Sequence, residues 1–187
     1  MVTFCSGVDL AAKESKPSGV SVISVNEDGR MELVFVGRVR RDEEIIKLLV
    51  DYQVKAVALD SPLSLPTSGF YRELDLELKK RGFNVLPPAW EAMKKLTLRA
   101  VKLATLLRAL RVEVLETHPS SCVKSSQCRS FDSLMKALGL TVPGTLGKDE
   151  RDSVIAAVAC VFYQLGKGFL ISASEGFIVL LPRICRE

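Results

Sequence analysis

Hydrophobic residues recur along this chain with two periods, one typical of strands and one typical of helices. Short apolar or alternating runs predict strands at residues 2–10, 18–25, 31–39, 55–59, 112–115 and 177–181. A helical period predicts helices at residues 42–52, 71–81, 91–111, 131–138 and 148–165. Three strands in succession, followed by single strands that alternate with helices, indicate a mixed α/β protein.

The first three predicted strands are joined by short connections, which favours an antiparallel meander. Residues 26–29, Asn-Glu-Asp-Gly, are turn-forming residues between the second strand and the third. The strand at 55–59 is almost wholly apolar, as in a parallel strand that helices cover on both faces. We therefore expect a mixed sheet, with a three-stranded meander beside parallel strands reached by right-handed crossovers, flanked by helices.

Length and composition agree with one folded unit. The chain has 187 residues, of which 48% are hydrophobic and 26% charged, and this mixture supports a buried core. We find no internal repeat, low-complexity segment or linker, so we expect a single domain over residues 1–187. The net charge of +4 is compatible with a polyanionic partner but does not identify one.

The distribution of apolar residues and cysteines bears on location. No apolar run approaches the roughly 18 residues of a membrane span, and the first residues lack a secretory leader. An odd, scattered set of five cysteines is typical of a reducing compartment, so we expect a cytoplasmic protein. Cys122 and Cys128 are near enough in sequence to pair if the source is a hyperthermophile. Asparagine occurs only at Asn26 and Asn84, which favours a thermophile.

Five acidic residues stand where a site could form. Asp9, Asp60 and Glu116 each come at or just after the end of a predicted strand, and the carboxyl ends of parallel strands share one edge of a sheet. Asp149 and Asp152 lie three apart at the start of the last long helix, hence on one face of it. If the strands are neighbours, these carboxylates converge.

Converging carboxylates repel one another, and a protein tolerates them mainly when one is protonated or a cation binds. Clusters of oxygen ligands suit Mg²⁺ or Mn²⁺. Two such ions about 4 Å apart can activate a water and stabilise the leaving oxygen in phosphodiester cleavage. Each acid also has a simpler explanation. Asp60 could begin a turn, Asp149 could cap its helix, and the helix dipole favours Asp152. Asp9 is harder to dismiss, because an acid after a buried strand needs a partner.

Seven segments stand out by their order and spacing: GVDLAAKESKPSGV (7–20), ALDSPLSLP (58–66), YRELDLELKKRG (71–82), MKKLTLRAVKLA (93–104), ETHPSS (116–121), KDERDSVIAAVAC (148–160) and SEGFIVLLP (174–182). With them the chain resembles, over nearly its whole length, the predicted nucleases of the domain-of-unknown-function family 429, which have a ribonuclease H (RNase H)-like fold.

The resemblance implies that the first strand lies next to the strands that end in Asp60 and Glu116. It implies that Asp9, Asp60, Glu116 and Asp152 line a catalytic site, with Mg²⁺ or Mn²⁺ as cofactor. The Asp149/Asp152 pair is similar to the arrangement in RuvC-type resolvases of the same fold superfamily.

The chain departs from ribonuclease H proper at one point. That enzyme carries a glutamate on its first helix. Here Glu43 and Glu44 begin that helix, and nothing in the pattern marks either as facing inward. Many enzymes of the superfamily act as dimers, so the resemblance leaves a homodimer open.

His118 is the single histidine and stands between Glu116 and Pro119. Strand alternation places it on the same side as Glu116, where it could shuttle a proton or orient water. Pro119 biases it toward an extended conformation. The alternative is a structural histidine, which is the commoner role of a lone one.

The long helix predicted at 91–111 is rich in basic residues and has no acid after its first position. Lys95, Arg99 and Lys102 follow at i, i+4 and i+7, which places them on one face and predicts contacts with a nucleic-acid backbone. The alternative is the solvated face of an amphipathic helix.

These features support three hypotheses. The first is a metal-dependent nuclease acting on DNA or RNA. The second is a non-catalytic nucleic-acid-binding or scaffold protein with the same fold. The third is an ATP-using phosphotransferase, although the chain is short for the duplicated domains of that group, and it contains no GxGxxG or GxxxxGK[ST] loop. The fold alone does not choose among them.

Overall fold

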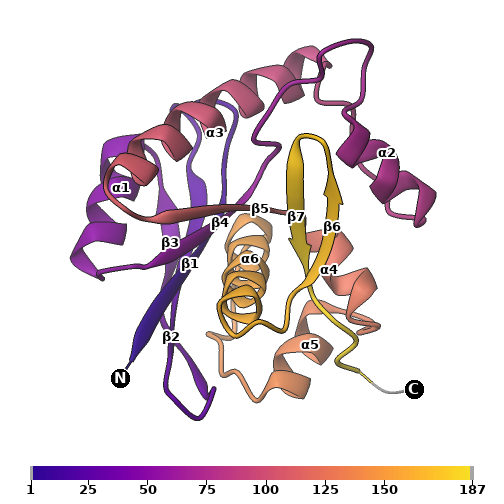
Figure 1. Cartoon of the computed structure of the whole chain (residues 1–187). Helices are drawn as coiled ribbons and strands as arrows, with labels where there is room; N and C mark the ends of the chain where they lie inside the picture. The colour runs from indigo at the N-terminus through magenta and orange to yellow at the C-terminus, as the bar shows by residue number, and fades with distance from the viewer. Residues whose placement is uncertain (1, 186–187) are drawn as a thin grey trace.

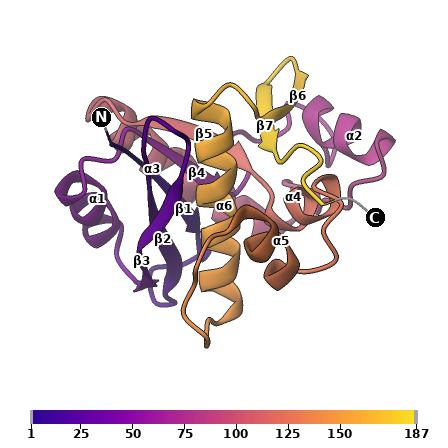
Figure 2. The ribbon, with the colours of Figure 1, turned by 90° about the horizontal axis from the view of Figure 1, so that it is seen from below.

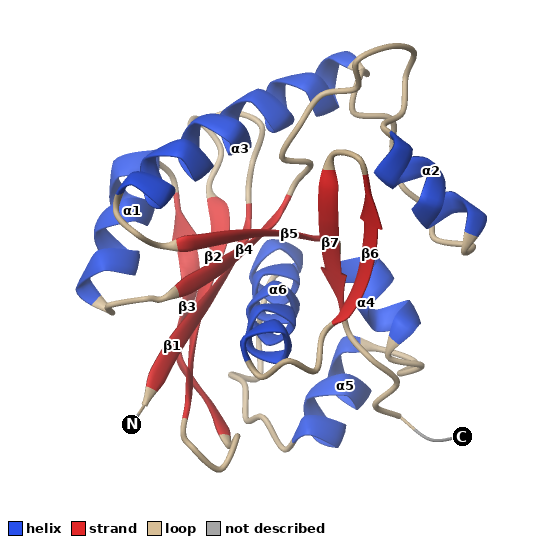
Figure 3. Ribbon diagram, in the orientation of Figure 1, coloured by secondary structure: helices blue, strands red, loops and turns tan. Residues whose placement is uncertain are grey.

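The computed structural model describes residues 2–185 and contains one seven-stranded sheet with helices on both faces (Figures 1 and 3). The strands are β1 (Thr3–Asp9), β2 (Ser18–Val25), β3 (Met31–Val39), β4 (Ala56–Asp60), β5 (Glu113–Thr117), β6 (Phe169–Ala173) and β7 (Gly176–Leu180). The helices are α1 (Asp42–Asp51), α2 (Glu73–Lys80), α3 (Glu91–Ala109), α4 (Pro119–Ser125), α5 (Phe131–Leu138) and α6 (Lys148–Gln164). The strand order is β3-β2-β1-β4-β5-β7-β6.

Strand pairing confirms the predicted mixed sheet. β3, β2 and β1 form an antiparallel meander, whereas β1, β4 and β5 run parallel to one another. In the register, Val8 lies beside Leu59, and Leu59 lies beside Glu116. The carboxyl ends of these three strands therefore reach the same edge of the sheet.

Two apolar layers follow from the alternation of side chains along the central strands. On β4, Val57 and Leu59 face the layer that contains α1 and α3, while Ala56 and Ala58 face the layer that contains α6. Burial on both faces explains why this strand is apolar almost throughout. Helix α6 packs on β1 and β2 on one side and on α4 on the other (Figure 2).

Two strand glycines allow α6 to lie directly on the meander. A Cβ at Gly7 would lie 2.1 Å from the carbonyl oxygen of Ser153, and one at Gly19 would lie 2.0 Å from that of Asp149. Only glycine permits so close an approach of a helix backbone to a strand. The contact is reinforced by Ser21, whose Oγ donates to the Ser153 carbonyl oxygen at 2.8 Å.

Two elements were not predicted. β6 is an edge strand whose residues are mostly exposed, so it lacks a strong pattern of alternating hydrophobicity. α4 begins at Pro119. Proline is well suited to the first helical position, because the N–H that it lacks would have no partner within the helix. The other elements match their predicted positions to within a few residues.

Cys122 and Cys128, whose pairing the sequence left open, do not pair with each other. Cys128 forms a disulfide with Cys185, 57 residues away, which ties the end of the described chain to the segment between α4 and α5. Cys122 is a buried free thiol at 3.3 Å from the Thr117 hydroxyl, and burial raises its pKa to about 12. Cys5 and Cys160 are also buried and unpaired. Within residues 2–185, no helix is both long and apolar enough to cross a membrane.

Candidate metal centre

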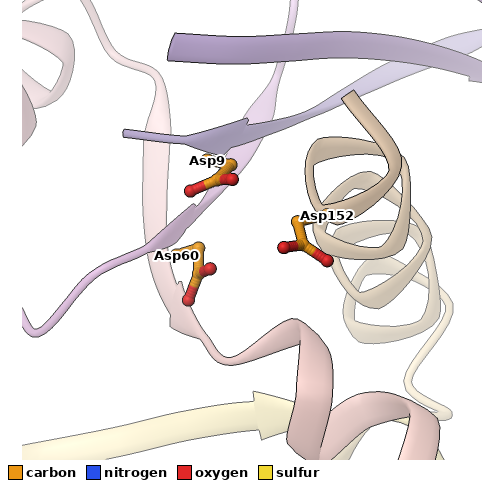
Figure 4. Close-up of side chains that lie close together, drawn as sticks. All are labelled: Asp9, Asp60 and Asp152. Carbon is orange, nitrogen blue, oxygen red and sulfur yellow. The ribbon is translucent and has the colours of Figure 1, made fainter. Parts of the chain in front are cut away.

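Three carboxylates converge at the edge of the sheet where β1 and β4 end (Figure 4). Asp9 is the last residue of β1, Asp60 is the last residue of β4, and Asp152 lies in the second turn of α6. One oxygen from each comes within 4.8 Å of the other two. All three side chains are half-buried. We call these residues the carboxylate triad.

Local sequence explains each position. The parallel register of β1 and β4 aligns their ends, so Asp9 and Asp60 become neighbours. Asp152 reaches them because Gly7 and Gly19 let α6 approach the sheet closely. The triad thus joins residues more than 140 positions apart through strand pairing and one helix–sheet contact.

The triad is electrostatically strained without a cation. Burial, and then the negative charge of Asp152, raise the pKa of Asp9 to about 6. Burial raises the pKa of Asp60 well above its ordinary value, and the charges of Asp9 and Asp152 add to the rise. The ammonium of Lys148 donates to Asp152 at 2.8 Å and lowers the pKa of both other acids.

These residues fit a hard divalent cation. The donor set consists of carboxylate oxygens only, which suits Mg²⁺ or Mn²⁺ better than metals that prefer nitrogen or sulfur. A bound cation would relieve the repulsion that raises the pKa values of Asp9 and Asp60.

Glu116 lies outside the triad, although it was predicted as a metal ligand. Its carboxylate is buried and receives two hydrogen bonds from the Arg72 guanidinium, at 2.6 and 2.9 Å. It also accepts from the backbone N–H of Leu63 at 2.8 Å. Burial raises the pKa of Glu116, and Arg72 opposes that rise. Glu116 therefore ties the segment after Asp60 to β5.

Asp149 was also predicted as a metal ligand, and its side chain points elsewhere. It is bound at 3.0 Å by Arg38 of β3, in an ion pair at the surface. Asp149 is still near enough to contribute to the raised pKa of Asp9. The spacing argument placed Asp149 and Asp152 on one face, but three residues also set them about 4.5 Å apart along the helix axis and about 60° apart around it.

His118 lies where the sequence predicted, beside the triad in a shared cavity with Asp9 and Asp60. Its backbone is extended, with φ −142° and ψ 98°, as expected before proline. Its Nδ1 lies 2.7 Å from the Ser121 hydroxyl. Burial lowers the pKa of His118, so the ring is neutral at pH 7.

The predicted phosphate-binding face of α3 does not exist as one surface. The guanidinium of Arg99 is buried, where it binds Asp42 at 2.8 Å and the carbonyl oxygen of Ala11 at 2.6 Å. Lys95 is exposed and pairs with Glu91 at 2.9 Å, and Lys102 is exposed. Arg99 thus stabilises the packing of α3 on α1. Asp42, the partner of Arg99, is the first residue of α1.

Two features beside the triad were missed. Arg72, the residue before α2, joins Asp75 and Glu116 in a buried ion-paired cluster. Lys148 is paired with Asp152 at i, i+4, a spacing that could have identified it. No local signal could have joined Arg72 to Glu116, 44 residues later. Glu43 and Glu44, at the start of α1, are exposed, and Glu44 pairs with Arg41.

Comparisons with known proteins identify the fold. No protein-family model matches the sequence, and no curated protein matches it. Among solved structures, RuvC of Thermus thermophilus aligns with a TM-score of 0.57 at 16% identity, covering 88% of this chain and 98% of that one. The same protein in complex with a Holliday junction substrate gives 0.56 at 16% identity, over 89% and 98%. The yeast mitochondrial Holliday junction resolvase Ydc2 gives 0.51 at 13% identity, over 86% and 78%.

The predicted RNase H-like fold is therefore confirmed, in the form found in RuvC. At these identities the similarity establishes the fold only. Membership of the domain-of-unknown-function family 429 stays a prediction.

Proposed function

We propose that this protein is a divalent-metal-dependent nuclease whose metal ligands are Asp9, Asp60 and Asp152. The observation that carries the proposal is the convergence of three carboxylate oxygens within 4.8 Å on a RuvC-like fold. The raised pKa values of Asp9 and Asp60 support it, because they reflect charge that a cation would neutralise.

Bound Mg²⁺ or Mn²⁺ would supply a Lewis acid for a phosphodiester and lower the pKa of a coordinated water. The protein's own groups surround that position. In the neutral tautomer whose Nδ1–H donates to the Ser121 hydroxyl oxygen, His118 can accept a proton at Nε2. Lys148 places a positive charge beside Asp152, and its ammonium, on a side chain that is 84% exposed, can contact a phosphate oxygen.

Arg72 and Glu116 have a positioning role in this proposal. Their ion pair, with the Leu63 N–H bond, holds residues 61–72 against β5. That segment follows Asp60 directly, so the pair keeps one ligand of the triad in place.

Branched DNA is the first substrate to test. One structural neighbour is bound to a Holliday junction and another is named as a resolvase of such junctions. The net charge of +4 is compatible with any nucleic acid. DNA junctions, single strands and RNA–DNA hybrids therefore belong in the same screen.

The decisive experiment is calorimetric titration of Mn²⁺ at low salt into the wild type, Asp9→Asn and Asp149→Asn. Asp149 is the matched control because it is an aspartate of the same helix as Asp152 whose side chain is paired with Arg38. We expect binding in the wild type and in Asp149→Asn and its loss in Asp9→Asn, with cleavage of the substrate following the same order. Equal Mn²⁺ binding by all three proteins, or none by the folded wild type, would refute the proposal. Junction binding without cleavage, unchanged in Asp9→Asn, would favour the non-catalytic alternative.

A further inference from the structure

A cavity of about 200 Å³ opens directly from the triad. Asp9, Asp60 and His118 contribute to its lining. Apolar side chains line it as well, from Leu78 of α2, Val85 and Leu86 of the following loop, and Met93 and Leu96 of α3. A ligand held at the triad would therefore extend into apolar surroundings.

Arg72 and Thr117, two polar residues of the cavity lining, already use their hydrogen-bond donors within the protein. Arg72 has five N–H groups. Its Nε donates to Asp75, its Nη1 to Ser64 and Glu116, and its Nη2 to Asp75 and Glu116. The guanidinium therefore has no free N–H with which to bind a phosphate. Thr117, which also lines the cavity, donates its hydroxyl to the carbonyl oxygen of Val179 at 2.7 Å.

This arrangement constrains the occupant. A negatively charged group belongs beside the triad, where a metal would bind, because the rest of the lining offers it no unpaired cation and includes the carboxylates of Asp75 and Glu116. The apolar side chains of the lining suit an uncharged, flat and largely apolar group. Ligand cavities for larger molecules occupy roughly 300 to 1,000 Å³, so a single ring system fits here and a base pair does not.

We propose that this cavity receives one unpaired nucleobase, whose own phosphate lies at the triad. The inference rests on the proposed nuclease function and narrows its substrate to nucleic acid with an unpaired or extruded nucleotide at the cleavage position. Extruding a base costs least where it is already unpaired. Apolar walls contact the flat face that every base has, and not the hydrogen-bonding edge that distinguishes one base from another. Recognition of this kind tolerates different sequences.

The mouth of the cavity supports the same occupant. Leu86 is 58% exposed, and a base that enters beside it would cover apolar surface now in contact with water. Leu86 and Val85 lie in the loop between α2 and α3, so neither belongs to the strands or the helix that hold the triad.

The test compares two ligands that share a phosphate and differ in the base. Binding of thymidine 5′-monophosphate and of 2-deoxyribose 5-phosphate is measured by calorimetry in saturating Mg²⁺. We expect the nucleotide to bind about tenfold more tightly or better, because only it places apolar surface in the cavity.

Two variants and one control locate the effect. Val85→Trp fills the cavity and should abolish the preference for the nucleotide while leaving Mg²⁺ and Mn²⁺ affinity unchanged. The control is Val50→Trp, the same substitution at an exposed position of α1, which should keep the preference. If Val85→Trp does not fold, Leu86→Ser removes the exposed apolar contact and should weaken the nucleotide several-fold without affecting the sugar phosphate.

Equal affinity of the wild type for the two phosphates overturns the cavity assignment, as does a preference that survives both cavity variants. Either result leaves the metal site intact if Mn²⁺ still binds in an Asp9-dependent way. If the wild type does not bind metal, the nuclease proposal is refuted instead. Different results therefore refute the cavity assignment and the nuclease proposal.

Discussion

Replacing Asp9 with asparagine should stabilise the metal-free protein at neutral pH. Asp9 shares its surroundings with Asp60 and Asp152, and burial together with the charge of Asp152 raises its pKa from 3.8 to about 6. Each pKa unit corresponds to about 1.4 kcal/mol, so ionised Asp9 costs the folded state about 3 kcal/mol at pH 7.5. Asparagine keeps the shape and carries no charge.

The pH dependence follows from the sign of the shift. Because the folded pKa lies above the unfolded value, the folded protein holds the Asp9 proton more tightly, and this contribution to stability is fully present below about pH 4. It is lost as pH rises through 6. The advantage of Asp9→Asn should therefore be near zero at pH 4 and reach about 1 to 3 kcal/mol at pH 7.5.

Urea unfolding in EDTA at both pH values measures this difference. Asp149→Asn is the control and should show a much smaller gain, because its carboxylate is paired with Arg38 at the surface and makes the smallest of the contributions to the raised pKa of Asp9. Addition of Mn²⁺ should shrink the advantage of Asp9→Asn by about 2.7 kcal/mol, since ligand at a hundred times its Kd stabilises the wild type by that amount and has no site in Asp9→Asn. An Asp9→Asn protein no more stable than the wild type in EDTA at pH 7.5 would show that the triad is not under electrostatic strain.

Three further substitutions test the framework around the triad. Gly7→Ala places a Cβ 2.1 Å from the Ser153 carbonyl oxygen, so the free energy of unfolding in urea should fall by about 3 kcal/mol and Mn²⁺ should bind more weakly. Unchanged values would contradict the close packing of α6 on the sheet. Arg72→Met leaves buried Glu116 unpaired and should cost about 3–5 kcal/mol in the same assay, whereas a neutral effect would mean that Glu116 is already protonated. Cys185→Ser should lower stability by about 2–4 kcal/mol in oxidising buffer and leave it unchanged in reducing buffer.

Much of the scaffold could be predicted from the sequence, because it depends on local patterns. Alternation and turn residues identified the three-stranded meander, and the apolar run at 55–59 identified a strand covered on both faces. The placement of Asp9 and Asp60 followed too, since acids at the ends of parallel strands share one edge.

The ionic partners of buried side chains could not be predicted in this way. Glu116 has the same position in its strand as Asp60 has in the neighbouring one, to within a residue, yet it is neutralised by Arg72. Arg99 has the same helical spacing as Lys95 and Lys102, yet it is buried against Asp42. A buried charge without an oppositely charged partner is costly, so a buried charged side chain pairs with a group that is close in space, whatever its distance in sequence.

The sequence by itself thus determined the order and nature of most elements and the acids at two strand ends. Only the tertiary structure decided which carboxylates remain together, since that depends on how closely α6 approaches Gly7 and Gly19 and on where Arg72 lies. It also decided the partner of Cys128, 57 residues away, and the apolar cavity beside the triad. Spacing along a chain predicts which side chains share a face of one helix or strand, whereas a site depends on distances between elements that are remote in sequence.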